Sequence, residues 1–511
     1  MGQTEAARAH WADEVAAAVV RGGRPVVLST GISPSGEIHI GNMREVLTAD
    51  AVFRALADRG VAAAFHFVAD SLDPLRRVYP FLDPARYAPL VGHALSSIPC
   101  PCGAHPSYAE HFLAPFLDAL TELRVGAEVL RADVLYASGR MTPWVVRALE
   151  RREQIARILH EVTGREVAAD WSPFQPACPA CGQLHGVRVT GFDAAASRVA
   201  YACGCGSAGT LPIAGSGKLT WRVDWPARWC ALGVTVEPFG KDHSTRGGSY
   251  DTGVRIVREV FEAEPPYPIP YEWIRLKGLG DMSSSRGNVL SIGRVLEIVP
   301  PQALRYLVLK ERPSRTIDFD PGPPLLQLVD QLDDATARGR DERAVELSRA
   351  GGFRPVGVPF QHLVVVAQAA RFDTNRVLEI LRRSGYAAAD PEAVASRMGH
   401  ARRWLEGFAP EDVRFEVQER LPEAARALPE GTRRLLGRLG ESLDDTMDAA
   451  TIHRTIYDLA TASGSVQPAE LFRAVYLALL GKPRGPRAGW FVELLGPAFC
   501  AARFREAARA D

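Results

Sequence analysis

A turn at residues 31–42 constrains the fold more than any other segment of this chain. It follows an apolar β-type run at 25–30 and precedes a helical pattern in which apolar residues recur from 46 to 55. Strand-to-helix turns bind phosphate, because backbone N–H groups and the positive end of the helix dipole face the anion. Two glycines let the backbone come close, and His39 can donate to a phosphoryl oxygen.

A second segment, 282–288, has the character of a loop over the same anion. It carries three hydroxyls, a nearby cation and no apolar side chain after Met282. Either segment alone is a weak signal, since glycine turns and serine triplets are more often solvated loops. Their order along the chain favours one shared ATP site.

Strand and helix patterns alternate from residue 25 onward, which is typical of a parallel, doubly wound sheet. Strands are expected at 25–30, 62–69 and 127–131, with helices at 43–58 and 142–162. A strand at 234–240, a helix at 250–261 and a strand at 271–276 continue the alternation. We therefore expect an α/β, Rossmann-like catalytic domain over 1–290.

Beyond residue 290 the apolar spacing is helical, and no strand is predicted. The helical segments are 322–333, 357–372, 374–385, 422–439, 448–462 and 468–480. We expect a connecting helical stem over 291–330 and an all-helical domain over 331–511.

Six of the eight cysteines stand in close pairs, a spacing that favours metal ligands over disulfides in a cytosolic chain. A tetrathiolate zinc site is predicted in a lobe of short strands inserted at about 170–220, from Cys178, Cys181, Cys203 and Cys205. A second structural zinc site is predicted in an insertion at about 98–112, from Cys100, Cys102, His105 and His111. The alternative there is a proline-rich loop with idle cysteines, in which His111 belongs to a helix.

Composition excludes some classes of protein. The chain has 511 residues, 47% of them hydrophobic, so it can form several domains with proper cores. Its net charge of zero argues against a general polyanion binder and leaves room for RNA bound at a local basic surface. No run reaches the roughly 20 apolar residues of a membrane span, and the N-terminus lacks signal-peptide features. We expect a cytoplasmic protein.

The two opening segments resemble the HIGH and KMSKS signatures of class I aminoacyl-tRNA synthetases. Here they are His39-Ile40-Gly41-Asn42 and Asp281-Met282-Ser283-Ser284-Ser285. Longer blocks are similar to class I lysyl-tRNA synthetases, namely 30–44, 70–78, 107–112, 218–229, 239–253, 271–288 and 481–490. The resemblance implies that ATP activates lysine as a lysyl-adenylate and that lysine is then joined to tRNA(Lys), with release of AMP and diphosphate.

The resemblance also implies which residues bind ATP and its Mg²⁺. The ATP-binding residues would be Ser33, Pro34, Gly36, His39, Gly41, Asn42, Met282, Ser283 and Ser284. Charge that develops on the phosphoryl oxygens would be stabilised by His39, Asn42, Ser283, Ser284, Ser285 and Arg286. No nucleophilic side chain is needed.

A lysine pocket needs carboxylates for two ammonium groups and aromatic walls for the aliphatic stem. Matching the family's pocket gives Gly31, Ser33, Trp221, His243 and Tyr271. The acidic candidates, which the sequence does not rank, are Asp70, Asp73, Asp224 and Asp242. Each has a structural alternative, such as a turn, a sheet contact or a helix cap.

The C-terminal domain resembles the anticodon-binding region of glutamyl-tRNA synthetase. A bent basic loop with an aromatic residue is suited to phosphate contact and base stacking, through Lys482, Arg484, Arg487 and Trp490. Solvated cations beside a buried tryptophan are the alternative. A monomer is expected, and protein partners are unknown.

One departure from the family keeps other functions open. Asp281 and Ser284 stand where the usual signature has lysines, so Arg286 or Lys277 must supply the cation. The alternative function is a catalytically altered paralogue that binds tRNA without charging it, or one that transfers an activated amino acid to a non-tRNA acceptor.

Overall fold

The computed structural model describes residues 9–278, 280–281, 289–349 and 355–510. The chain forms two compact units. The sheet unit comprises Met1–Leu296, Pro301–Phe319 and Asp341–Gly351. The helical unit comprises Glu297–Pro300, Asp320–Arg340 and Gly352–Asp511. The chain passes between the units more than once, because 341–351 belongs to the sheet unit although both of its neighbouring segments belong to the helical unit.

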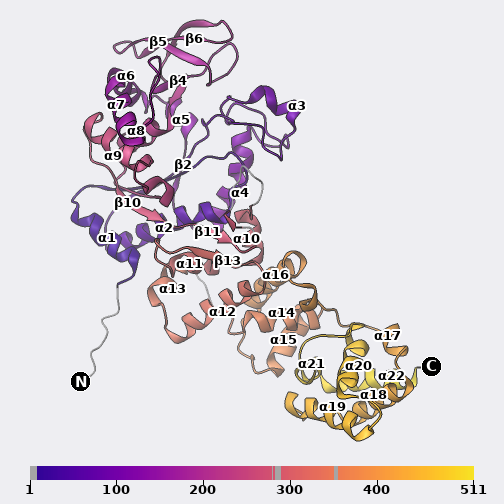
Figure 1. Ribbon diagram of the computed structural model, residues 1–511. Helices are drawn as coiled ribbons and strands as arrows, with labels where there is room; N and C mark the ends of the chain where they lie inside the picture. Colours follow the sequence, from indigo (N-terminus) through magenta and orange to yellow (C-terminus); the bar gives the residue numbers. More distant parts are fainter. Residues whose placement is uncertain (1–8, 279, 282–288, 350–354, 511) are drawn as a thin grey trace, which may run out of the picture. The chain divides into compact units, whose positions relative to one another are not determined.

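The sheet unit is built on five parallel strands in the order β10-β9-β1-β2-β3. Figure 1 labels two of these strands, β2 and β10. The strands are β1 (Val26–Ile32), β2 (Ala63–Ala69), β3 (Glu128–Arg131), β9 (Val236–Gly240) and β10 (Tyr267–Tyr271). The predicted doubly wound α/β fold is therefore confirmed. The strand order reverses between β1 and β9, and in open parallel sheets ligands bind at the carboxyl ends of the strands at this switch point.

Helices flank the sheet. α2 (Ile40–Ala57) contacts β1, β2 and β9. α8 (Trp221–Leu232) and α9 (Ser249–Glu259) pack on each other and share an apolar core with Phe239 of β9. α4 (Tyr108–Glu122) follows the loop that contains the first cysteine pair. These helices place the N-terminus of α2 and the aromatic face of α8 at the switch point.

Two predicted elements are divided. The strand predicted at 271–276 is the end of β10 followed by β11 (Ile274–Leu276), which lies in a separate sheet ordered β12-β11-β13. The helix predicted at 142–162 is α6 (Thr142–Glu150) and α7 (Arg152–Thr163), because the backbone of Arg151 leaves the helical region at φ −107° and ψ 23°. α6 packs on α8, whereas α7 packs on α9.

The expectation of no strand after residue 290 is wrong. β13 (Ile317–Phe319) pairs in parallel with β11, and β12 (Gly280–Asp281) pairs with β11 in the antiparallel sense. The preceding segment is held by the buried Arg44, whose guanidinium donates to the carbonyls of Trp273, Arg312, Pro313 and Arg315. These partners lie more than 220 residues from Arg44 in sequence, so local pattern does not reveal the strand.

The predicted lobe of short strands is present. β5 (Val187–Asp193), β6 (Arg198–Cys203) and β7 (Ala208–Pro212) form an antiparallel sheet. β4 (Phe174–Pro176) pairs with β8 (Gly217–Leu219) at the base of the insertion. The lobe therefore enters and leaves the sheet unit through one pair of neighbouring strands.

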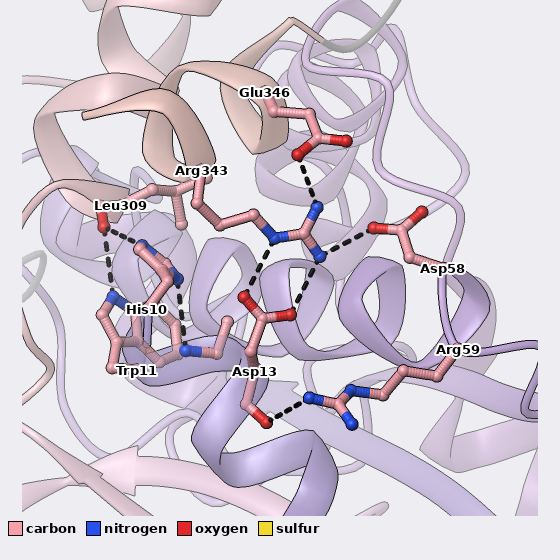
Figure 2. Close-up of polar contacts among 9 residues, drawn as sticks. His10, Trp11, Asp13, Asp58, Arg59, Leu309, Arg343 and Glu346 are labelled. Atoms are coloured by element: carbon pink, nitrogen blue, oxygen red, sulfur yellow. Dashed lines mark hydrogen bonds and ion pairs between the residues drawn. The ribbon is translucent and has the colours of Figure 1, made fainter. Parts of the chain in front are cut away.

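The N-terminal helix α1 (Trp11–Arg21) joins distant parts of the sheet unit (Figure 2). The His10 Nε2 and Trp11 Nε1 atoms lie 2.9 and 3.1 Å from the carbonyl oxygen of Leu309 in α11 (Pro301–Leu309). Arg343 of α13 (Glu342–Ser348) forms ion pairs with Asp13, Asp58 and Glu346. This network fixes α13 to the sheet unit.

The described residues of the helical unit contain no strand, so the predicted all-helical C-terminal region is confirmed. Its main helices are α12 (Pro323–Arg338), α14 (Phe360–Ala369), α15 (Thr374–Arg383), α16 (Pro391–Gly407), α18 (Glu430–Ser442), α19 (Ala449–Ser463), α20 (Pro468–Leu480), α21 (Ala488–Leu495) and α22 (Pro497–Arg509). α18 and α22 approach closely because Gly437 and Gly440 carry no Cβ, which at Gly437 would lie 2.8 Å from the Ala508 Cβ. Within the described part of the chain, no helix combines the length and apolarity that crossing a membrane requires.

Candidate active site

The turn after β1 presents a neutral histidine at the N-terminus of α2. The His39 Nδ1 accepts a hydrogen bond from the Gly41 N–H at 3.1 Å, and the Asn42 side chain accepts from the His39 N–H at 3.2 Å. Burial lowers the pKa of His39 to about 4. Because Nδ1 is an acceptor, the proton of the neutral ring lies on Nε2, which is free to donate to an anion.

The chain that follows the serine segment returns to this turn. Residues 282–288, including Met282, Ser283, Ser284, Ser285 and Arg286, lie outside the described residues, as does the side chain of Asp281. Directly after them, the Leu290 carbonyl accepts from the Ile40 N–H at 3.3 Å, and the Ile292 N–H donates to Ile38 at 3.1 Å. The segment that follows the second motif is thus hydrogen bonded to the segment that carries the first.

A small cavity of about 50 Å³ lies at the switch point between β1 and β9. A water needs roughly 10–15 Å³ in this measure, so the space fits a polar group such as an ammonium together with a few waters. Three acidic side chains line it, Glu45, Asp70 and Glu237. The lining also includes Gly31, Trp221 and His243 from the predicted pocket.

Glu45 is a residue that the sequence prediction missed. Its carboxylate accepts from the Gly31 N–H at 2.9 Å and from the Tyr271 hydroxyl at 2.7 Å. Burial raises the pKa of Glu45 to about 7. Tyr271 therefore reaches the cavity through Glu45. The available signal was a carboxylate in the second turn of the helix that follows the His39 turn.

Glu237 lies on β9, is 6% exposed and was also missed. Its two oxygens accept hydrogen bonds from the indole N–H groups of Trp225, at 2.8 Å, and Trp229. Burial raises the pKa of Glu237 to about 8 despite these two donors. A charged residue within a buried strand, Val-Glu-Pro-Phe, was the sequence signal.

Aromatic rings form the walls of the cavity. Trp221 stacks on Trp225 with centroids 5.5 Å apart and planes 12° apart. The His243 ring lies 5.5 Å from Trp225 and 6.1 Å from Trp221. The spacing of Trp221, Trp225 and Trp229 by four residues places all three indoles on one face of α8.

The structure distinguishes among the acidic candidates. Asp70 lines the cavity and pairs with Arg228 at 2.8 Å, and burial raises the pKa of Asp70 to about 6. Asp73 pairs with the buried Lys218 at 2.6 Å and does not line the cavity. Asp224 pairs with Arg228 at 2.8 Å. Ser33 and Asp242 are likewise absent from the cavity wall, and Asp242 is exposed beside His243.

Both predicted groups of metal ligands are assembled. In each group one ligand atom per residue lies within 4.8 Å of all the others. For Cys100, Cys102, His105 and His111, the distances between sulfur and Nδ1 atoms are 3.3–3.5 Å. The edges of a tetrahedron around zinc would be about 3.3–3.8 Å for such ligands. The set fits a tetrahedral ion even though His111 belongs to α4.

The four cysteines of the inserted lobe fit as well. The Cys178 and Cys205 sulfurs are 3.7 Å apart, and those of Cys181 and Cys203 are 3.6 Å apart. About 3.75 Å is the edge that Zn–S bonds of 2.3 Å give in a tetrahedron. Two ligands come from the turn before β5, one from the last residue of β6 and one from the turn after it, so the ion would hold together the ends of these two strands.

In the helical unit, two cavities adjoin the predicted tRNA-binding loop. They measure about 910 and 630 Å³, and His362 and Trp490 line both. The His362 ring lies 5.5 Å from Trp490 and 5.0 Å from Tyr386. Arg487 lines the smaller cavity, and the Lys482 ammonium donates to the Arg414 carbonyl at 3.4 Å.

Comparison with known proteins identifies the family. Residues 9–350 match the family described as tRNA synthetases class I (K). A lysine–tRNA ligase of Methanosarcina barkeri (strain Fusaro) is 47% identical, over 98% of this chain and 97% of that protein. The chain belongs to this class I tRNA synthetase family. A lysine–tRNA ligase of Archaeoglobus fulgidus is 46% identical, over 98% of this synthetase and all of the relative. Among solved structures, a glutamate tRNA ligase from Elizabethkingia meningosepticum aligns with 96% of this synthetase and 100% of that chain, at 14% identity and a TM-score of 0.44.

Proposed function

We propose that this synthetase joins L-lysine to tRNA(Lys) in an ATP-dependent reaction that serves protein synthesis. The observation that carries the proposal is the cavity at the switch point, because its acidic floor and aromatic walls suit an amino acid with a terminal ammonium. Relatives called lysine–tRNA ligases match nearly the whole chain, which supports the same assignment.

Glu45 is the proposed partner of the lysine ammonium. Hydrogen bonds from Gly31 and Tyr271 hold its carboxylate in place. No lysine or arginine of the described residues forms an ion pair with it. A ligand cation would therefore supply the missing positive charge. Trp221 and His243 would cover the aliphatic stem, and the α-amino group would face Asp70 or the exposed Asp242.

In the first step, the lysine carboxylate attacks the α-phosphorus of ATP, and the bond to diphosphate breaks. Negative charge grows on the phosphoryl oxygens, where the His39 Nε2–H and the N-terminus of α2 can stabilise it. In the second step, a terminal ribose hydroxyl of tRNA attacks the lysyl carbonyl, and AMP leaves. The chain after 282–288 binds to the His39 segment, which supports a role for Ser283, Ser284, Ser285 and Arg286 near the diphosphate.

The helical unit is proposed to hold the anticodon loop. The cavities beside His362 and Trp490 expose ring surface on which unpaired bases could stack, and Arg487 offers a phosphate contact. Lys482 and Arg484 lie on the same bent loop between α20 and α21.

Zinc is proposed at both ligand clusters, as a structural ion. Metal analysis of the purified protein should give two zinc ions per chain. Cys178→Ser should lose one ion and loosen the lobe, and Cys100→Ser should lose the other, since a structural zinc site contributes roughly 10 kcal/mol to folding. Cys500→Ser, at a buried cysteine outside both clusters, is the control. Folded protein without metal would contradict the assignment.

The proposed function is tested by ATP–diphosphate exchange with each amino acid, with and without tRNA. We expect exchange with lysine that depends on tRNA(Lys), followed by lysyl-tRNA formation. Exchange with a different amino acid would contradict the substrate, and transfer of lysine to another acceptor would favour the alternative function. Absence of exchange with tRNA(Lys) present would favour a non-charging paralogue.

A further inference from the structure

The cavity at the switch point is lined by three carboxylates but by only one lysine or arginine side chain, that of Arg228. Glu237 of β9 and Glu45 of α2 both line the cavity, and Glu237 accepts hydrogen bonds from two indole N–H groups. Among the described residues, neither carboxylate has a lysine or arginine within ion-pair distance. Arg228, which also lines the cavity, is already paired with Asp70 and Asp224.

A buried carboxylate without a paired cation is costly when ionised, because little water remains to solvate its charge. The charge of Glu45 also disfavours ionisation of Glu237, and the charges of Asp70 and Asp242 disfavour ionisation of Glu45. Burial accordingly raises the pKa of Glu45 to about 7 and that of Glu237 to about 8. In the ligand-free protein near neutral pH, this pair therefore retains a proton.

We propose that the ammonium of lysine and a proton compete for the carboxylate pair of Glu45 and Glu237, so that lysine binding releases a proton from this pair to solvent. The inference rests on the proposed function, and it adds Glu237 as a residue that sets the charge of the pocket. The lysine ammonium keeps its own protons. One carboxyl O–H bond breaks, the proton goes to water or buffer, and the new carboxylate pairs with the ammonium.

Glu237 also positions the pocket wall. Its two oxygens hold the indole N–H groups of Trp225 and Trp229, and Trp225 in turn supports Trp221 by stacking. A change in the charge of Glu237 would therefore change the position of Trp221, the ring that would cover the lysine stem. The other titratable or charged groups around the pair are Asp70, Arg228, Asp242, His243, Tyr250 and Tyr271.

The test is calorimetric titration of lysine into the full-length protein at pH 7, in buffers whose ionisation enthalpies differ. We expect the apparent binding enthalpy to change linearly with the buffer enthalpy, with a slope that reports release of about half a proton to one proton. The Kd for lysine should fall severalfold, up to about tenfold, between pH 6 and 7, and should level off above pH 8.

Glu237→Gln should reduce the slope and flatten the pH dependence, whereas Glu153→Gln, at an exposed residue of α7, should change neither. An unchanged slope in Glu237→Gln would show that Glu237 takes no part in the proton release, and it would overturn the proposal of a proton shared by Glu45 and Glu237. The wild-type measurement keeps the test decisive if Glu237→Gln does not fold. Lysine binding with a buffer-independent enthalpy overturns this inference alone. No lysine binding, together with no lysine-dependent exchange, overturns the proposed function and this inference with it.

Discussion

Two groups of buried or half-buried carboxylates in the sheet unit differ in what balances their charge. Asp73 is paired with Lys218, and Asp224 with Arg228, so the chain itself neutralises these acids. Glu45 and Glu237 have hydrogen-bond donors but no paired cation among the described residues. The first group is therefore neutralised within the fold, whereas the second has no such partner among the described residues.

The two groups also respond to pH in opposite directions. Burial alone would raise the pKa of Asp73, but the Lys218 ammonium and hydrogen bonds from Lys218 and Ser33 hold it below its ordinary value. Its stabilisation is present above the unfolded pKa and is lost as pH falls through the folded pKa. Glu45 and Glu237 have raised pKa values, so their contribution is full below the unfolded pKa and is lost as pH rises through 7 to 8.

Removing the cation that pairs with Asp73 should give the largest effect on stability. Lys218→Met leaves the Asp73 carboxylate buried without a cation, so we expect the free energy of unfolding to fall by about 3–5 kcal/mol. Denaturant unfolding at pH 7 measures it. The double variant Asp73→Asn, Lys218→Met should recover part of the loss. A cost below about 1 kcal/mol would mean that the pair does not stabilise the fold. The difference drawn between the paired and unpaired carboxylates would then not hold.

Neutralising Glu45, which has no paired cation, should impair function more than stability. Glu45→Gln removes the charge proposed to meet the lysine ammonium, and truncating one partner of a buried charge pair costs about 2–5 kcal/mol. We expect kcat/KM for lysine to fall by about 30-fold to 5,000-fold, while KM for ATP changes little. Measurement of aminoacylation at saturating tRNA gives both constants. Equal losses for lysine and ATP would place Glu45 in the fold rather than in the pocket.

The smallest expected effect is on the pH dependence of stability. Glu237→Gln cannot ionise, so between pH 6 and 9 it should lose less unfolding free energy than wild type, by on the order of 2 kcal/mol. Thermal unfolding of both proteins across this range, without lysine, provides the measurement. Glu441→Gln, at an exposed position of α18, serves as the control. Parallel stability curves for wild type and Glu237→Gln would show that Glu237 does not titrate in this range.

Local patterns predicted much of the fold. The alternation of strands and helices predicted the parallel sheet, and the helical spacing predicted the C-terminal domain. The short β11 and β13 strands were misjudged because their partners are distant in sequence and because Arg44 fixes the segment between them through carbonyls. Three-residue strands carry too little alternation for a pattern to detect.

The sequence by itself determined the elements whose chemistry is local. These are the turn at His39 with its helix N-terminus and the cysteine and histidine spacings that assemble two possible metal sites. Only the tertiary structure decided which carboxylates face the cavity. Asp73 and Glu45 are both acids in the same α/β unit, but whether a cation lies within reach depends on Lys218, 145 residues away in the chain. A charge is balanced by whatever lies near it in space, and spacing along the sequence does not record that.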